Sequence, residues 1–169
     1  MVRLERIDDV ALERLIALAT SEASPDEVMP PVEGPPGWTQ SRHDAFRAFY
    51  RSRRYGLESA CREVMLLIVN DDQIVGSVRL ATIDPDTFET GMWLTRSTRG
   101  RGIGADVLRA VIAEVTTRGA RRLIVETTSG NGGALSILKR CGATFRSPDS
   151  DGRVHAHFQL GSSVDNVVE

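Results

Sequence analysis

The sequence has few cysteines, a single lysine and no long apolar run. Its two cysteines, Cys61 and Cys141, cannot build a disulfide scaffold, so we expect two free thiols in a reducing compartment. The longest apolar run covers Val64–Val69, whereas a membrane-spanning helix needs about 20 residues. The first residues contain no apolar signal segment. These absences predict a cytoplasmic protein without a membrane-spanning segment.

Acidic and basic residues nearly balance, so the chain has no large excess of charge of either sign. The chain has 23 acidic and 21 basic residues, a formal charge of −2. Nucleic-acid-binding domains usually carry a strongly basic face, so we expect no nucleic-acid partner. A length of 169 residues with 41% hydrophobic residues indicates one globular domain. We expect it over residues 1–160, followed by a loose tail at 161–169.

Apolar periodicity predicts alternating strands and helices. The pattern indicates helices near residues 10–19, 39–54, 102–118 and 131–140, and strands near 2–7, 62–70, 74–82, 87–95, 122–128, 143–147 and 154–160. Short turns separate the strands at 62–70, 74–82 and 87–95, which is typical of an antiparallel meander. The unbroken Leu123-Ile124-Val125 predicts that its strand is covered on both faces.

The most irregular stretch is Ser21–Gly37. It holds five of the seven prolines and four acidic residues, with no basic residue among them. Loops of this length in a compact domain are usually functional or disordered. Its acidic residues are Glu22, Asp26, Glu27 and Glu33.

The segment Arg99–Gly104 holds three glycines where a strand-to-helix loop opens a helix. Glycine lets the backbone approach a ligand closely, and the free N–H groups of a helix start attract anions. Arg99 and Arg101 add positive charge. We expect no packing role for these glycines and interpret the turn as a diphosphate site.

A dinucleotide-binding fold is a rival interpretation. Gly100-x-Gly102-x-x-Ala105 fits a G-x-G-x-x-G/A fingerprint, and Glu126 follows Ala105 by 21 residues. The polar segment 96–99 between strand and glycines, the arginines in the turn and the preceding meander oppose this interpretation.

Three motifs at suitable spacing resemble the GNAT superfamily of N-acetyltransferases. Arg99-x-x-Gly102-x-Gly104 resembles its pyrophosphate-binding motif, Glu89–Thr95 its splayed fourth strand, and Asn131–Ala143 its later helix motif. The order of predicted elements is similar over about residues 2–160. The resemblance implies an α/β (α+β) fold, a mixed and mostly antiparallel central sheet of about seven strands with about four helices on its faces.

The same resemblance implies acetyl-CoA as donor, with no metal. Backbone groups of Trp93, Leu94 and Thr95 would pair with the pantetheine arm like an added strand. Asn131 would contact that arm or only cap its helix. The pyrophosphate would lie against the N–H groups of Arg99, Gly100, Arg101, Gly102, Ile103 and Gly104.

The resemblance also implies direct transfer to a primary amine, without an acyl-enzyme. Glu89 matches a carboxylate that deprotonates the amine in several members, and Glu126 is a second candidate. Many members carry a tyrosine acid seven residues after the motif asparagine, where this chain has Leu138. The groups left to protonate the thiolate are Ser136, Tyr50, Tyr55 or water.

The acceptor is less constrained by the sequence. Acidic residues such as Glu33, with Trp38 and Glu126 near the cleft, favour a small cationic amine, for example an aminoglycoside-type antibiotic or a polyamine. The acids could equally pair with arginines of the following helix. A protein N-terminus or lysine is an alternative acceptor, and a non-catalytic acyl-CoA-binding module is an alternative function.

Two further features stay open. His155 and His157 face one side of the last strand, but no third ligand at suitable spacing supports a metal site. Exposed strand edges and the arginine-rich helix near 39–54 are compatible with a homodimer.

Overall fold

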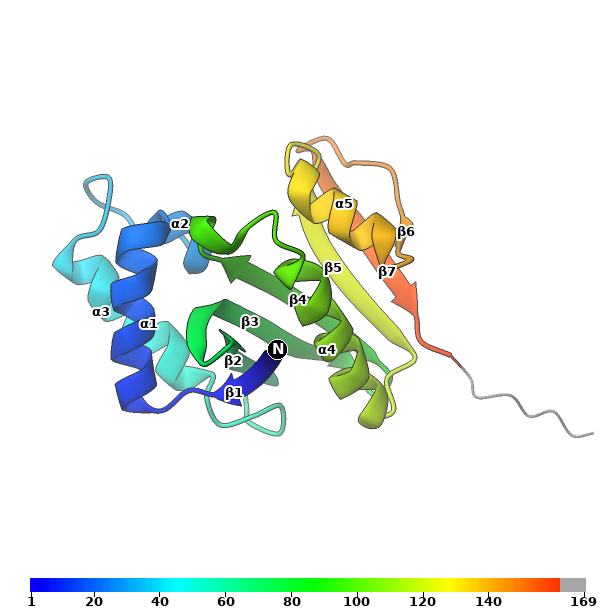
Figure 1. Cartoon of the computed structure of the whole chain (residues 1–169), viewed down its shortest axis with the longest axis horizontal. Helices are drawn as coiled ribbons and strands as arrows, with labels where there is room; N and C mark the ends of the chain where they lie inside the picture. The colour runs from blue at the N-terminus through cyan, green and yellow to red at the C-terminus, as the bar shows by residue number, and fades with distance from the viewer. Residues whose placement is uncertain (162–169) are drawn as a thin grey trace, which may run out of the picture.

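The computed structural model describes residues 1–161, and its centre is one seven-stranded sheet (Figure 1). The strand order is β1-β2-β3-β4-β5-β7-β6, and only β4 and β5 run parallel. The predicted mixed, mostly antiparallel sheet with its meander is therefore confirmed. The strands are β1 Val2–Arg6, β2 Glu63–Asn70, β3 Gln73–Asp84, β4 Thr87–Leu94, β5 Arg122–Thr128, β6 Thr144–Phe145 and β7 Arg153–Gln159.

Helices cover the sheet in two groups, which Figure 1 shows at opposite ends of the molecule. The helices α4 and α5 pack with one face of the sheet in one core cluster. The helices α1, α2 and α3 pack with the other face of β2, β3 and β4 in a second cluster. The helices are α1 Asp9–Glu22, α2 Pro25–Val28, α3 Gln40–Ser52, α4 Ile103–Thr117 and α5 Gly132–Arg140, with a 3₁₀ turn, η1, at Arg96–Thr98.

The short helix α2 was not predicted, because it lies inside the proline-rich stretch expected to be irregular. Pro25 occupies its first turn, where a missing N–H costs nothing. The Glu27 carboxylate accepts hydrogen bonds from the Ser24 N–H at 2.7 Å and the Ser24 hydroxyl at 2.9 Å. A serine followed three residues later by glutamate is the signal of a helix start that could have revealed this helix.

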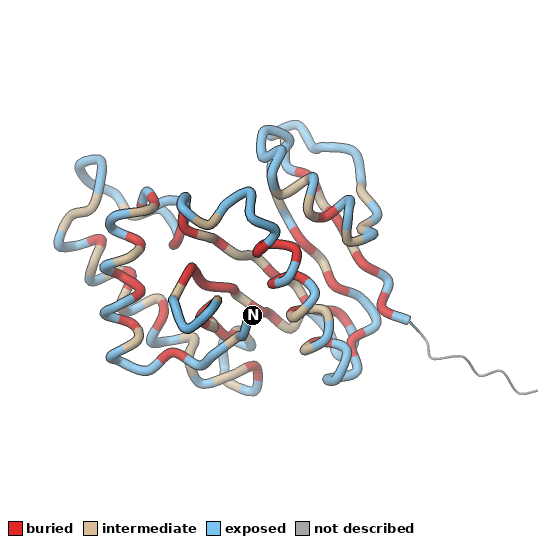
Figure 2. The backbone as a smooth tube through the Cα atoms, in the orientation of Figure 1, coloured by how far each residue is buried: buried red, intermediate tan, exposed pale blue. Residues whose placement is uncertain are grey.

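The prediction that β5 is covered on both faces was wrong. Leu123 and Val125 are buried against the α4 side, but Ile124 is only half-buried and Glu126 is exposed. Figure 2 shows this alternation along β5 and β7. The second core cluster takes strand residues from β2, β3 and β4 and none from β5, β6 or β7. Among residues 1–161, no helix therefore covers this face of the β5–β7–β6 part of the sheet.

The arginine-rich helix α3 uses its charge within the molecule. Arg47 pairs with Glu13 at 2.8 Å and Arg51 pairs with Asp9 at 3.1 Å. Arg54, two residues after the helix, also pairs with Asp9, at 3.0 Å. These ion pairs join α3 and its C-terminal end to α1, so Arg47 and Arg51 meet acids of α1 instead of those of the proline-rich stretch. Among residues 1–161, no helix combines the length and apolar character needed to cross a membrane.

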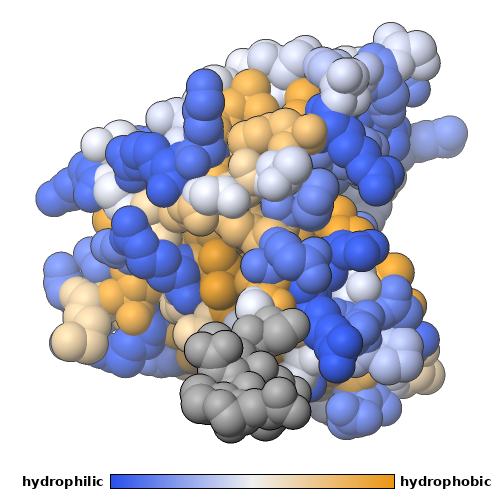
Figure 3. Space-filling view, turned by 90° about the vertical axis from the view of Figure 1, so that its right-hand side faces the viewer, coloured by the Kyte–Doolittle hydropathy of each residue, from blue (hydrophilic) through white to orange (hydrophobic). Residues whose placement is uncertain are grey.

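The far edge of the sheet is short. The strand predicted at 143–147 is reduced to Thr144–Phe145, because Pro148 has no N–H to continue the pairing that the Arg146 N–H makes with His155 of β7. Figure 3 faces this end of the molecule, where apolar side chains form a band between hydrophilic ones. Most of the predicted tail lies outside the described residues.

Candidate active site

The main feature of the site is a gap between β4 and β5. The two strands pair over four positions, from Thr87 with Arg122 to Thr90 with Val125. Beyond that point β4 continues beside β3 to Leu94, and β5 continues beside β7 to Thr128. Because the strands diverge, each has an unpaired edge that faces the other, and an extended ligand can lie between them.

Two hydrogen bonds show which backbone N–H and C=O groups of β4 point toward β3 and which point toward the gap. The Thr95 N–H donates to the Val75 carbonyl of β3 at 2.9 Å, and the Leu94 carbonyl accepts from Arg99 Nε at 3.1 Å. Successive backbone groups alternate along a strand, so Met92 and Leu94 face the gap. Of the predicted residues Trp93, Leu94 and Thr95, only Leu94 therefore directs its backbone into the gap. Met92 was missed, and the two-residue alternation was the signal that could have found it.

The glycine-rich turn lies at the start of α4, after β4 and η1. Gly100 and Gly102 have φ angles of 76° and 84°, which only glycine adopts without strain. Within the described part of the chain, the N–H groups of Gly100–Gly104 donate no hydrogen bond. Five successive free donors at the positive end of a 15-residue helix form a site for an anion such as a diphosphate.

Gly104 has a packing role that the sequence analysis excluded. A Cβ atom on Gly104 would lie 2.7 Å from Ile137 Cδ1 and 3.5 Å from Leu94 Cδ1. Glycine at this position therefore lets α4 approach α5 and β4 closely. By contrast, a Cβ on Gly102 would meet no atom within 4 Å, so its requirement is the backbone angle alone.

Asn131 caps α5. Its Oδ1 accepts a hydrogen bond from the Ala134 N–H at 3.1 Å. This is the capping interpretation left open by the sequence.

Glu89 belongs to a chain of charges on the face of the sheet opposite α4. Arg79 on β3 binds the Glu89 carboxylate and also pairs with Glu63 on β2 at 2.8 Å, and Arg53 at the end of α3 binds Glu63 as well. The side chains of Arg53, Glu63, Arg79 and Glu89 are between 23% and 30% exposed to solvent. They hold Glu89 in a fixed place beside the point where β4 and β5 separate.

Of the predicted side-chain acids, Ser136 and Tyr55 are exposed and Tyr50 is buried. Ser136 is exposed and lies about 200° around α5 from the buried Leu138, at 100° per residue. Tyr55 is exposed on a loop.

Tyr50 is fully buried, and its hydroxyl contacts Ser77 Oγ at 2.7 Å and accepts from Trp93 Nε1 at 3.1 Å. Burial raises the pKa of Tyr50 to about 12, which makes it a poor proton donor at neutral pH.

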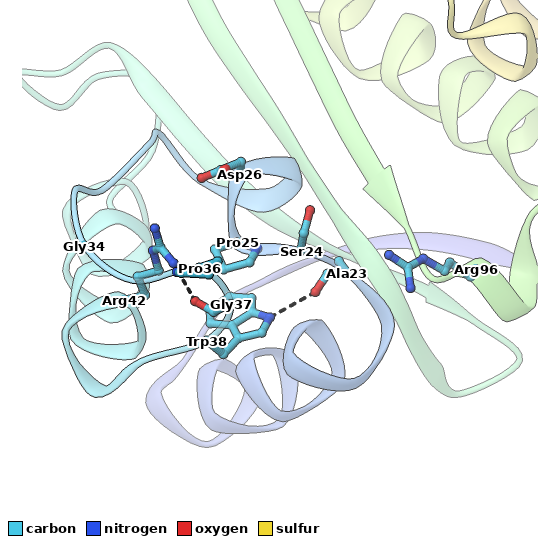
Figure 4. Close-up of a pocket in the computed structure, with 10 residues that line it drawn as sticks. All are labelled: Ala23, Ser24, Pro25, Asp26, Gly34, Pro36, Gly37, Trp38, Arg42 and Arg96. Carbon is cyan, nitrogen blue, oxygen red and sulfur yellow. Dashed lines mark hydrogen bonds between the residues drawn. The ribbon is translucent and has the colours of Figure 1, made fainter.

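A pocket of about 580 Å³ lies between the end of α1 and the loop before α3 (Figure 4). The Trp38 indole lines it, donates to the Ala23 carbonyl at 2.9 Å and stacks on His43 with ring centroids 5.2 Å apart. Arg96 approaches it from the segment after β4. Of the predicted substrate residues, Trp38 lines this pocket, whereas Glu33 is exposed and does not.

Arg42 of α3 shapes this pocket from within. It is 8% exposed, and its guanidinium donates to the carbonyls of Val32 at 2.9 Å, Gly37 at 2.6 Å and Pro35. A single buried cation therefore fixes the fold of the proline-rich loop.

Two of the four acids in the stretch Ser21–Gly37 bind the segment that leads to the glycine turn. Glu22 accepts from the Ser97 N–H at 3.3 Å, and Glu27 pairs with Arg96 at 3.5 Å and Arg99 at 3.4 Å. The Ser24 N–H and the Arg99 side chain hold the pKa of Glu27 below its usual range. The acidic stretch is thus tied to the glycine turn.

Glu126 lies across the gap from β4, on the uncovered face of β5. It is exposed, with contacts to Arg153 at 3.7 Å and His155 at 3.9 Å. The structure therefore places it on the same face of the sheet as Glu89.

Comparison with known families agrees with this geometry. A family model described as Acetyltransferase (GNAT) domain matches residues 2–144. A sequence comparison with curated proteins gives no match.

Solved structures of similar fold cover nearly the whole chain. The GNAT domain of S. lividans PAT is 21% identical, with a TM-score of 0.68 over 94% of this chain and 89% of that chain. RimL, a ribosomal L7/L12 α-N-protein acetyltransferase in complex with coenzyme A, is 16% identical, with a TM-score of 0.74 over 94% of each chain. The spermidine N-acetyltransferase from Vibrio cholerae, a dodecamer, is 11% identical, with a TM-score of 0.71 over 99% of this chain and 98% of that chain. At these identities the likeness shows the fold.

Proposed function

The chain belongs to the GNAT acetyltransferase family, and from this premise we propose that it transfers the acetyl group of acetyl-CoA directly to a primary amine. The observation that carries the proposal is the gap between β4 and β5 with five free N–H groups near its mouth. The gap suits an extended pantetheine arm, and the N–H groups suit the diphosphate.

In the proposed reaction the amine nitrogen attacks the thioester carbonyl carbon, and the carbon–sulfur bond then breaks. The Leu94 N–H faces the gap and would donate to the carbonyl oxygen as negative charge develops there. The coenzyme A thiolate leaves and takes a proton from water, since the Tyr50 hydroxyl is buried and engaged by Ser77 and Trp93. Acetyl transfer in one step leaves no acyl-enzyme.

Glu89 is the proposed base that takes the proton from the attacking amine. It lies on the acceptor face of the sheet beside the point of separation, and Arg79 keeps it there. Gly91, the next residue on the same face, supports this role, because no atom lies within 4 Å of the place of its missing Cβ. The open space above Gly91 suits the amine.

We propose a small amine as acceptor. Asp26 and Glu33 form no ion pair within the described residues and favour the cationic acceptors considered above, an aminoglycoside-type antibiotic or a polyamine. The similar fold of a spermidine N-acetyltransferase supports this class. The uncovered face of β5 and β7 and the similar fold of RimL favour a second candidate, a protein N-terminus.

The test is acetyl-CoA-dependent thiol release with a panel of aminoglycosides, polyamines, amino acids and short peptides. Release with one class identifies the acceptor class. Tight acetyl-CoA binding without release from any amine would contradict acetyl transfer and favour a CoA-binding module. Light scattering of the same samples tests the proposed homodimer.

A further inference from the structure

The uncovered face of β5, β7 and β6 carries a second cavity, of about 210 Å³. Strand register places its side chains in three rows: Arg122 pairs with Gln159, Ile124 with His157, and Glu126 with His155. The Arg146 N–H donates to the His155 carbonyl at 2.9 Å, which extends the third row to Arg146. The residues that line the cavity are Arg122, Ile124, Arg146, His155, Ala156, His157 and Gln159.

The polar groups of this cavity are largely without partners. Across residues 1–161, the side chains of Arg122, Arg146, His157 and Gln159 make no hydrogen bond or ion pair. The nearest carboxylate, Glu126, is shared between Arg153 and His155. The lining therefore carries two positive guanidinium groups, hydrogen-bond donors beside them, and no carboxylate of its own.

We propose that this cavity binds an anionic group, a carboxylate or a phosphate, on the acceptor amine. Arg122 on β5 and Arg146 directly after β6 line one cavity with no carboxylate among the lining residues, so an anion in the cavity would be attracted by both guanidinium groups. Guanidinium groups match the planar or tetrahedral oxygens of these anions through paired N–H donors. The inference rests on the proposed acetyl transfer and favours the second candidate acceptor, a peptide N-terminus accompanied by negative charge, over the aminoglycosides and polyamines.

The pairing of the strands gives the distance between Glu89, where the amine would react, and the cavity, where the anionic group would bind. Glu89 pairs with Ile124, and Ile124 pairs with His157, so the base and the centre of the cavity lie two strands apart on one face. With about 4.8 Å between neighbouring strands, the separation is about 10 Å. Three extended residues span roughly that distance, so a tripeptide places its amine and carboxylate at these two points.

The first measurement is NMR of the three histidine side chains during titration with inorganic phosphate at constant pH. We expect the imidazole signals of His155 and His157 to shift and saturate, whereas His43, stacked on Trp38 in α3, stays unchanged and reports general ionic effects. Arg146→Gln should weaken phosphate binding at least tenfold.

The matched control for this titration is Arg121→Gln, which removes the same charge from the residue next to Arg122. Arg121 is exposed and does not line the cavity, so its loss should change the affinity less than twofold. Equal shifts in all three histidines, or unchanged affinity in Arg146→Gln, would overturn the site.

The second measurement links the cavity to acetyl transfer. Triglycine and triglycinamide differ only in the terminal carboxylate, and both are measured as substrates and as competitors of the fastest amine in the panel. We expect triglycine to be favoured about tenfold in wild type and in Arg121→Gln, and to lose its advantage in Arg146→Gln.

The two measurements separate the two claims. Equal behaviour of the two peptides, including no effect of either, would overturn an acceptor role for the cavity. Arginine-dependent phosphate binding in a protein that releases no thiol with any amine would retain the anion site and refute acetyl transfer.

Discussion

Replacing Tyr50 with phenylalanine tests whether a buried polar cluster holds β4 in place. The Tyr50 ring is fully buried between α3 and the sheet, and its hydroxyl joins Ser77 on β3 to Trp93 on β4. Trp93 directly precedes Leu94, whose N–H faces the gap. The cluster therefore connects the helix layer to the strand that would hold the donor.

The size of the effect follows from the groups left behind. Phenylalanine keeps the ring contacts but leaves the Trp93 N–H and the Ser77 hydroxyl without their partner. An unsatisfied buried polar group costs about 1–3 kcal/mol, so two of them predict a loss of about 2–6 kcal/mol in the free energy of unfolding. For a domain of this size, each kcal/mol lowers the melting temperature by about 2–4 °C, so it should fall by roughly 4–24 °C.

Urea unfolding followed by tryptophan fluorescence, with thermal melts beside it, measures this loss. Tyr55→Phe is the matched control, because Tyr55 is 68% exposed and should change stability by less than about 0.5 kcal/mol. A double-mutant cycle with Ser77→Ala should show coupling between the two sites. A loss in Tyr50→Phe no larger than in the control, or strict additivity in the cycle, would refute the reasoning.

Three further predictions concern the donor turn, the base and alkaline pH. Gly102→Val should lower the affinity for acetyl-CoA at least tenfold, because a branched side chain disfavours the φ angle of 84° at this position. Gly119 has the same φ angle outside the turn, so Gly119→Val should leave the affinity unchanged when both variants are measured by titration calorimetry. Glu89→Gln should lower kcat/KM about 100-fold near pH 7 and progressively less at high pH, where free amine accumulates. Glu5→Gln, at an exposed carboxylate on β1, should keep the wild-type pH–rate profile; an unaltered profile in Glu89→Gln would reject it as the base. Because the pKa of Tyr50 rises from 10 to about 12 on folding, its contribution to stability is complete below pH 10 and is lost by about pH 12, a change of about 3 kcal/mol that Tyr50→Phe should lack in alkaline urea titrations.

Much of the fold could be predicted because local pattern and tertiary environment agree. The strand at Arg122–Thr128 has the predicted bounds, and α4 lies within one residue of them at each end, because glycine marks both of its ends. The family membership and the mixed sheet implied by the resemblance are confirmed. The short helix α2 was missed because the five prolines of the surrounding stretch Ser21–Gly37 indicated a loop.

Less of the site could be predicted from the sequence, because the site depends on how the strands pair. The resemblance implied a splayed strand at Glu89–Thr95, but nothing local reveals that the separation begins after Thr90 or that backbone alternation turns Leu94 and Met92 toward the gap. The packing role of Gly104 depends on Ile137, which lies 33 residues later in a different helix. Arg42 is one of several arginines in α3, and only the fold of the loop around it distinguishes it.

Because β4 and β5 pair over only four positions, the sheet is two halves, β1–β4 and β5–β7, joined by a short seam. α4, which packs against both β1 and α5, spans that seam on one face. A donor that extends along β4 would lengthen the seam, so saturation should couple the two halves into one cooperative unfolding unit. At a concentration one hundred times its Kd, such a ligand adds about 2.7 kcal/mol to global stability. The amide protons of Met92 and Leu94 should then change from fast exchange to slow exchange with solvent.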